Sequence, residues 1–250
     1  MYKTILVVHG MRKGKLNETL VNFIHRTFDA HILDYDVAFL ESEERSLELV
    51  IQTTINAGYR RIHFIPLLLF SASHYYEDIK VLCEIYGKKY PNVQLVLGKP
   101  LGTHARMTMW VSSQIKNNQH AIDASTGIVI LAHGNPQFDE PNIALTEICD
   151  KLSTPTHPCY PSMVYGEYTF TKSLPKIARK YHKLLIIPFF FYDGYLVNKT
   201  KRRILELNLP TEIVYTQAIN FHPILEEVVR ERMRECEEVP NVSYSIESCP

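Results

Sequence analysis

Three residues with metal-binding or proton-accepting side chains each follow an apolar run of the sequence. His9 ends the run "LVVH", Glu41 ends "AFLE", and His74 lies in "PLLLFSASHYYEDI". Imidazole and carboxylate ligands together suit a borderline divalent ion such as Fe²⁺, Co²⁺ or Ni²⁺. Because imidazole titrates near neutrality, the two histidines could also accept protons. A single histidine at a strand end is usually an ordinary polar residue at the rim of a sheet, so the prediction of a catalytic and metal-binding site depends on all three side chains meeting.

The apolar runs predict strands that alternate with helices. In the first half, strands are expected in "KTILVVHG", "YDVAFLE", "RIHFIPLLLF" and "VQLVLGKPLG", and apolar residues at helical spacing follow each of them. A continuous apolar run such as the third one is typical of a strand that is buried on both faces of a parallel sheet. The carboxyl ends of parallel strands lie at the same edge of a sheet, where ligands bind in such folds. We therefore expect His9, Glu41 and His74 to converge there.

The same pattern restarts after the polar stretch 116–127. Strands are expected in "GIVILAHG", "PSMVYGE", "KLLIIPFFF" and "TEIVYTQAI", again with helices between them. Three pairs of residues occupy equivalent positions in the two halves: His9 and His133, Pro66 and Pro188, and His104 and His222. This internal duplication predicts an α/β fold with two similar doubly wound domains, each containing a parallel four-stranded sheet.

The expected domains are 1–118, which carries the active site, and 126–250, a repeat that completes a cleft. The second half keeps His133 but has no histidine in "PFFFYDGYLVNKT". That asymmetry predicts one working site rather than two. The chain is expected to be a monomer that contains an internal pseudo-dimer.

Basic residues flank the predicted edge of each sheet. Arg12 and Lys13 follow Gly10 at or before a helix N-terminus, and Lys199 and Lys201 lie in the second half. Backbone amides and the helix dipole at such a position favour carboxylates, which indicates a polyanionic ligand. A glycine also allows a flat ligand to approach the backbone closely. The candidate substrate-binding residues are Gly10, Met11, Arg12, Lys13, His133, Asn135 and Asn198.

Composition excludes several other classes of function. The 27 basic and 27 acidic residues balance, so no general field favours nucleic acid or a membrane surface. The longest apolar run, 64–70, is too short to span a bilayer, and no signal peptide is expected. The five cysteines form no C-x-x-C pair. They predict a reducing compartment, with no disulfide framework and no structural zinc, and therefore a cytoplasmic protein.

The motifs around the three candidate ligands resemble those of the class II chelatases, the sirohydrochlorin ferrochelatase and cobaltochelatase family. "LVVHG" looks like the opening histidine-glycine motif, "FLE" like the second-strand glutamate, and "PLLLFSASHYYEDI" like the segment with the second histidine. The resemblance covers essentially the whole chain in the family's double-length form. Met11 stands where the family commonly has serine, and Lys80 where proline is frequent.

The resemblance implies that the chain inserts Fe²⁺ into sirohydrochlorin, the last step of sirohaem synthesis. His9 and His74 would bind the ion, accept pyrrole protons, or do both, and Glu41 would complete the site. The expected partner is a carboxylate-rich tetrapyrrole. No cofactor is expected beyond the divalent metal substrate, Fe²⁺ or else Co²⁺ or Ni²⁺, and the sequence has neither a P-loop nor a G-x-G-x-x-G motif.

Several alternatives remain open at this point. Cobalt or nickel could replace iron on the same or a related tetrapyrrole, because histidine and carboxylate accept all three ions. The chain could also be a non-catalytic carrier of the metal or the tetrapyrrole. A histidine phosphatase is disfavoured because Val8 occupies the place of the arginine that such enzymes need before the histidine. A protoporphyrin ferrochelatase is disfavoured by the early histidine motif and the basic residues.

Overall fold

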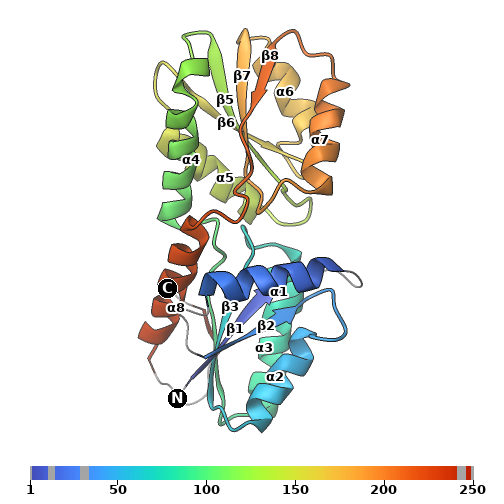
Figure 1. Cartoon of the computed structure of the whole chain (residues 1–250), viewed down its shortest axis with the longest axis vertical. Helices are drawn as coiled ribbons and strands as arrows, with labels where there is room; N and C mark the ends of the chain where they lie inside the picture. The colour runs from blue at the N-terminus through green and yellow to red at the C-terminus, as the bar shows by residue number, and fades with distance from the viewer. Residues whose placement is uncertain (1, 11–14, 29–33, 241–245, 249–250) are drawn as a thin grey trace. The chain divides into compact units, whose positions relative to one another are not determined.

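The chain folds into two compact units. The computed structural model describes residues 2–10, 15–28, 34–240 and 246–248. Unit 1 comprises Met1–Gly102 and Pro223–Pro250, and unit 2 comprises Thr103–His222. Helices and strands alternate in both units, as the apolar periodicity predicts (Figure 1).

Unit 1 contains a parallel sheet with the strand order β2-β1-β3-β4-β9. Its elements in chain order are β1 (Lys3–Val8), α1 (Lys15–Phe28), β2 (Tyr35–Phe39), α2 (Leu47–Asn56), β3 (Arg61–Pro66), the π-helix η1 (His74–Lys80), α3 (Val81–Lys89), β4 (Gln94–Leu97), α8 (Ile224–Glu238) and β9 (Ile246–Ser248). The four predicted strands are present, and the short β9 adds a fifth next to β4.

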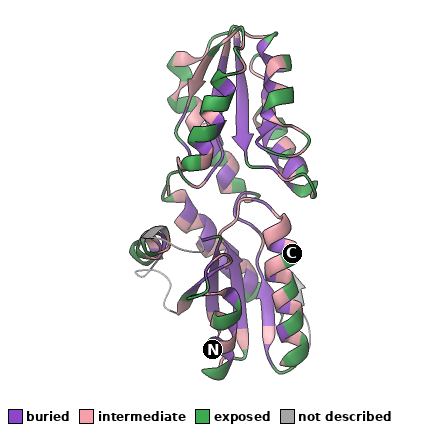
Figure 2. Ribbon diagram, turned by 90° about the vertical axis from the view of Figure 1, so that its right-hand side faces the viewer, coloured by how far each residue is buried: buried purple, intermediate pink, exposed green. Residues whose placement is uncertain are grey.

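Helices cover both faces of this sheet, which is why its strands are continuously apolar. All residues of β1 and β3 except the first are buried. On one face, Ile5 and Phe64 pack with Ile51 of α2 and Cys83 of α3 in a single apolar core. Helices α1 and α8 lie on the opposite face (Figures 1 and 2). The sheet is therefore fixed on both sides, and its carboxyl edge is a rigid base for a site.

Unit 2 repeats this arrangement with four parallel strands in the order β6-β5-β7-β8. Its elements are α4 (Ala105–Asn117), η2 (Gln119–Ala121), β5 (Thr126–Ala132), α5 (Glu140–Leu152), β6 (Cys159–Met163), α6 (Phe170–Ala178), β7 (Lys183–Pro188), α7 (Tyr195–Leu205) and β8 (Glu212–Tyr215). Strand β6 begins before the predicted run "PSMVYGE" and contains Pro161. A proline is tolerated there because β6 is an edge strand, where a missing backbone N–H costs no ladder bond.

The compact units divide the chain differently from the predicted domains 1–118 and 126–250. The helix that follows the fourth strand of each repeat belongs to the other unit, so α4 lies in unit 2 and α8 in unit 1. Packing explains the exchange. Trp110 of α4 packs against Phe189 of unit 2, and α8 buries Val228 and Val229 in unit 1, where it contacts β3. The repeat in the sequence and the unit in space are thus offset by one helix.

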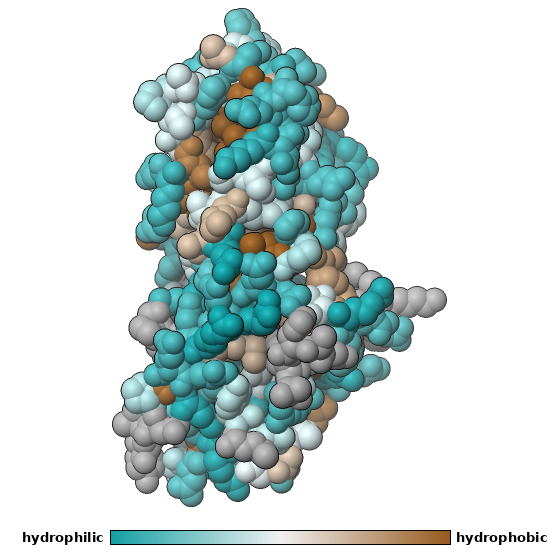
Figure 3. All heavy atoms as spheres, turned by 60° about the vertical axis from the view of Figure 1, so that its left-hand side comes forward, coloured by the Kyte–Doolittle hydropathy of each residue, from teal (hydrophilic) through white to brown (hydrophobic). Residues whose placement is uncertain are grey.

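One face of the molecule is mainly polar (Figure 3). Hydrophilic side chains cover most of the described surface on the face drawn in Figure 3. Among the described residues, the longest and most apolar helices fall short of what a membrane span requires.

Candidate metal centre

His9, Glu41 and His74 meet at the carboxyl edge of the unit 1 sheet. One ligand atom from each residue lies within 4.8 Å of the ligand atoms of the other two. His9 directly follows β1, Glu41 follows β2 by two positions, and His74 is the first residue of η1. Because β2, β1 and β3 are neighbours in the sheet, three successive strand ends bring these side chains to one point. Within the described part of the chain, no second group of at least three His, Cys, Asp or Glu side chains has this spacing.

Backbone hydrogen bonds beyond the ends of the strands hold the three ligands in register. Leu40 N donates to Val8 O at 3.0 Å, and Glu41 N donates to His9 O at 3.0 Å. Leu67 N, at the start of the segment that leads to His74, donates to Val7 O at 2.8 Å. The parallel ladder therefore continues into the site and fixes His9 and Glu41 relative to the sheet, while His74 is reached through the 67–73 segment.

Gly10 allows the chain to turn sharply after His9. Its φ angle is +69°, in the left-handed region that glycine adopts without a steric penalty. A Cβ at this position would lie 2.6 Å from Phe39 Cδ1, so the turn also packs tightly against the end of β2. The prediction that Gly10 contacts substrate is untested, but its conformation fixes the direction in which His9 leaves the strand.

The hydrogen bonds of the two histidines leave the same ring nitrogen for a metal. His9 Nδ1 lies 2.9 Å from Gly10 O, and His74 Nδ1 lies 2.7 Å from Asp78 Oδ2. A carbonyl or carboxylate oxygen can only accept, so Nδ1 is the donor in both rings. In the neutral imidazole, Nε2 then carries the lone pair that coordinates a metal. The rings pack edge to face, with centroids 4.4 Å apart and planes at 86°.

Asp78 is a further residue of the site that is not among the residues predicted from the sequence. Its carboxylate orients His74, a common device in metal sites, where an outer carboxylate fixes the tautomer of a ligating histidine. The signal was present in the sequence, since Asp78 follows His74 by four residues and η1 brings the two side chains together.

The candidate centre is open to solvent. His9 is exposed, and Glu41 and His74 are partly buried. It contains no cysteine, so it differs from the closed sites that hold structural zinc. Two imidazoles and one carboxylate with an accessible side can bind a divalent ion and release it to a second ligand.

The remaining predicted substrate-binding residues fall into two sets. Met11, Arg12 and Lys13 lie outside the described residues. The other three belong to unit 2: His133 follows β5, Asn135 Oδ1 accepts from Gln137 N in the next turn, and Asn198 is exposed on α7. Their contact with substrate stays a prediction.

Unit 2 repeats the backbone of the site but not its ligands. His133 Nδ1 lies 2.8 Å from Gly134 O, and Gly134 has a φ of +70°, as at His9 and Gly10. Tyr165 N donates to His133 O at 3.0 Å, so Tyr165 occupies the position of Glu41. Its ring centroid lies 5.2 Å from that of His133. An aromatic ring thus replaces the carboxylate, and in the described residues of unit 2 the same chain geometry brings no three candidate metal ligands together.

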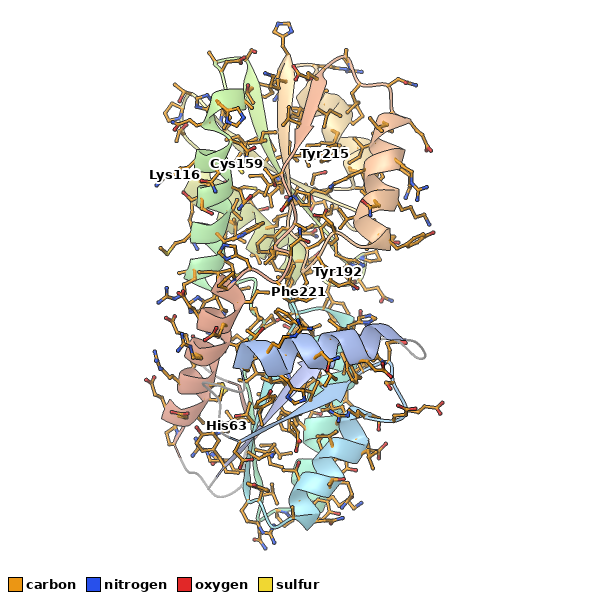
Figure 4. All side chains as sticks on the ribbon, viewed as in Figure 1. His63, Lys116, Cys159, Tyr192, Tyr215 and Phe221 are labelled. Carbon is orange, nitrogen blue, oxygen red and sulfur yellow. The ribbon has the colours of Figure 1, made fainter. Side chains whose placement is uncertain are left out.

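Two further clusters lie elsewhere in the units. His63 is fully buried near the amino end of the unit 1 sheet, next to Thr4 of β1, and accepts from Arg61 Nε at 2.9 Å (Figure 4). Burial, with the nearby Arg61 charge, lowers the pKa of His63 to about 4. His63 is therefore neutral at physiological pH. In unit 2, the rings of Tyr192 and Phe221 stack 5.6 Å apart (Figure 4).

The CbiX family model matches the chain twice. The matched residues are 3–118 and 127–236, so both repeats carry the family pattern and together they account for most of the chain. Each matched range corresponds to one repeat of the sequence and includes most or all of the helix that packs in the other unit, α4 or α8.

Curated relatives of this chain are named sirohydrochlorin chelatases. A sirohydrochlorin ferrochelatase of Bacillus subtilis (strain 168) is 25% identical over 94% of this chain and 92% of its own length. A sirohydrochlorin cobaltochelatase of Priestia megaterium is 24% identical over 94% of this chain and 80% of its own length.

Solved structures confirm the predicted fold class. SirB from Bacillus subtilis with Fe³⁺ superposes with a TM-score of 0.81 at 21% identity, covering 98% of this chain and 99% of SirB. SirB in complex with cobalt, from Bacillus subtilis subspecies spizizenii, gives a TM-score of 0.76 at the same identity and coverage. The resemblance first indicated by the motifs around His9, Glu41 and His74 is also confirmed, and the chain belongs to the CbiX family.

Proposed function

We propose that this protein is a metallochelatase that inserts Fe²⁺ into sirohydrochlorin. The observation that carries the proposal is the convergence of His9, Glu41 and His74 within 4.8 Å at an open edge of the sheet. Membership of the CbiX family and the names of the relatives support the substrate and the reaction.

The three side chains bind the incoming ion in this mechanism. Nε2 of His9 and Nε2 of His74 donate lone pairs, and the Glu41 carboxylate offsets part of the positive charge. The remaining coordination positions face solvent, so pyrrole nitrogens of the macrocycle can replace water before the protein ligands leave. A metal substrate must be released, and release is easier from an open site with three protein ligands than from a closed cage with four.

Metal insertion also releases two protons, because two pyrrole N–H groups of the macrocycle are exchanged for bonds to Fe²⁺. The imidazoles regain their Nε2 lone pairs as the ion moves to the macrocycle, and each can then accept one proton. Asp78 stays hydrogen-bonded to His74 at Nδ1 and keeps the ring oriented while Nε2 takes the proton. Solvent then takes the protons, and the neutral rings are ready for another ion.

A metallation assay tests this proposal. Wild-type protein and His74→Ala are mixed with excess sirohydrochlorin and Fe²⁺ under anaerobic conditions, and the absorption of the metallated ring is followed. We expect many turnovers with the wild type and a rate at least about a hundredfold lower with the variant, a typical loss for an acid–base or metal-positioning group. Binding of sirohydrochlorin without acceleration would instead identify a non-catalytic carrier.

Cobalt is the strongest alternative metal. The Priestia megaterium relative is named a cobaltochelatase, and one SirB structure contains cobalt. The same donor set accepts Fe²⁺, Co²⁺ and Ni²⁺, so geometry discriminates weakly between them. Comparing kcat/KM for the three ions in the same assay decides the metal.

The remaining parts of the proposal concern the cell and the assembly. We propose a cytoplasmic monomer that needs no cofactor beyond the metal substrate. The described cysteines support a reducing compartment, since Cys83, Cys149 and Cys159 are buried thiols that form no disulfide. The internal repeat supports the monomer, because one chain supplies both halves.

A further inference from the structure

Two buried or partly buried arginine contacts fasten helix α8 to the rest of unit 1. Helix α8 comes from the end of the chain and contacts β3 (Figures 1 and 2). Arg232, on α8 itself, reaches the segment that follows β4. Arg61, at the amino end of β3, reaches the last turn of α8. These contacts lie at opposite ends of the sheet, so they can be tested against each other.

Arg232 is an uncommon residue for a helix interior because it is only 4% exposed. A buried guanidinium is costly unless it is paired and hydrogen-bonded. Its Nη1 lies 2.9 and 2.7 Å from the two oxygens of Glu235 one turn later on the same helix. The ion pair compensates the charge and holds the guanidinium in one orientation. Nη2 then donates to Pro100 O at 3.0 Å.

The segment that Arg232 holds lies directly against the segment that presents His74. Leu101 N donates to Leu68 O at 2.8 Å. A Cβ on Gly102 would lie only 2.1 Å from Leu69 O, so the two backbones are in close contact. The Leu101–Leu68 hydrogen bond therefore ties residue 68 to the segment after β4, and the close contact at Gly102 leaves Leu69 no room to move toward that segment.

His74 follows this contact by five residues. The segment 67–73 is anchored at its start, where Leu67 N donates to Val7 O and Leu68 O accepts from Leu101 N. It ends in η1, where Tyr75 N donates to Ala72 O at 2.9 Å. The connection therefore runs from the Arg232 guanidinium to Pro100, across the Leu101–Leu68 hydrogen bond, and then along the chain to the His74 imidazole.

We propose that Arg232 is a positioning residue for the metal centre and acts through the 100–102 segment on His74. This inference rests on the proposed function, because it assumes that His74 binds the metal substrate. Helix α8 thus contributes to the geometry of the site although no residue of α8 is among the ligands. Loss of the contact to Pro100 should let the 67–73 segment move and enlarge the range of His9–His74 distances.

The experiment compares Arg232→Met with Arg61→Met. Arg61 Nη2 donates to three carbonyls at the end of α8, those of Cys236, Glu237 and Val239, at 2.9, 3.2 and 2.8 Å. Both variants remove a guanidinium that fastens α8, but only one contact leads to His74. Co²⁺ affinity is measured by absorption titration at a temperature where each variant is folded, and the melting temperature is recorded separately.

We expect both variants to melt at a lower temperature, while only Arg232→Met weakens Co²⁺ binding, by about tenfold. A loss of this size is typical when an outer partner of a metal ligand is removed. In a His74→Ala background, Arg232→Met should add less than about twofold, because its effect passes through His74. Unchanged Co²⁺ affinity in Arg232→Met, an equal loss in Arg61→Met, or a further tenfold loss without His74 would each overturn the proposal.

A measurement without metal separates this inference from the proposed function. Hydrogen exchange of peptides that cover 67–80 should be faster in Arg232→Met than in wild type and unchanged in Arg61→Met. If Arg232→Met does not fold, Arg232→Lys, which keeps the charge near Glu235 but cannot reach both partners with a planar fork, is measured in its place. Wild-type protein that does not bind Co²⁺ would contradict the proposed metal centre. Independently of that result, unaltered exchange at 67–80 in Arg232→Met would contradict the positioning role of Arg232.

Discussion

The hydrogen bond between His74 and Asp78 should determine a measurable part of the metal affinity. Asp78→Ala removes the carboxylate that accepts from His74 Nδ1 at 2.7 Å, a distance in the charge-assisted range. A hydrogen bond to a charged group contributes about 1.5–3 kcal/mol. The side chains are 34% and 48% exposed, so water replaces part of the lost bond and the lower end of this range applies. About 1.4 kcal/mol corresponds to about a tenfold weaker Kd for the metal.

Competitive titration of Co²⁺ against a chromophoric chelator measures this change. Glu77→Ala is the matched control, because it removes an exposed carboxylate from the same helix while leaving the His74–Asp78 contact in place. Asp78→Asn should fall between wild type and Asp78→Ala, since the amide oxygen can accept but carries no charge. The reasoning is refuted if Asp78→Ala binds Co²⁺ as tightly as wild type, or if Glu77→Ala weakens binding equally.

Three further changes test other parts of the structure. His9→Ala should lower the metallation rate by at least about a hundredfold and His133→Ala by much less, since only His9 belongs to the metal centre; equal losses in steady-state assays would contradict a single site. Gly10→Ala places a side chain at a φ of +69°, and Gly134→Ala places one at +70°. Each should lower the free energy of unfolding in urea by about 1–3 kcal/mol, but only Gly10→Ala should weaken Co²⁺ binding. Burial lowers the pKa of His63 from 6.5 to about 4, so between these pH values the unfolded state binds more protons than the folded state. The free energy of unfolding should therefore fall by up to about 3 kcal/mol as the pH decreases from 6.5 to 4. His63→Phe should flatten this part of the profile, and an identical pH dependence in urea unfolding of the two proteins would show that His63 is not the cause.

The sequence predicts the strands and the convergence of the three ligands for the same reason. Apolar β-branched runs such as "TILVV" are unfavourable outside a buried sheet, and the residue that follows such a run must lie at the sheet edge. Because β1 and β2 are neighbouring parallel strands, the positions of His9 and Glu41 at the sheet edge are fixed. The polar residue at the end of an apolar run was therefore the most informative local signal.

Tertiary packing decides the features that the sequence does not reveal. Helices α4 and α8 have similar apolar stripes, and nothing within either stripe specifies which unit it covers. The contact between Arg232 and Pro100 joins residues 132 positions apart, and no periodic pattern reports it. In the sequence, nothing distinguishes Tyr165 from other aromatic residues. The backbone of unit 2 shows that it occupies the position of Glu41 in unit 1.

Location of a bound ion tests the central claim most directly. Crystals of the protein grown with Co²⁺ and measured at the cobalt absorption edge should show an anomalous peak within bonding distance, about 2.0–2.2 Å, of His9 Nε2, His74 Nε2 and a Glu41 oxygen. The peak should disappear in His9→Ala crystals grown in the same way. An ion bound elsewhere in the wild type, or a peak that survives the substitution unchanged, would contradict the assignment of these three side chains as the metal centre.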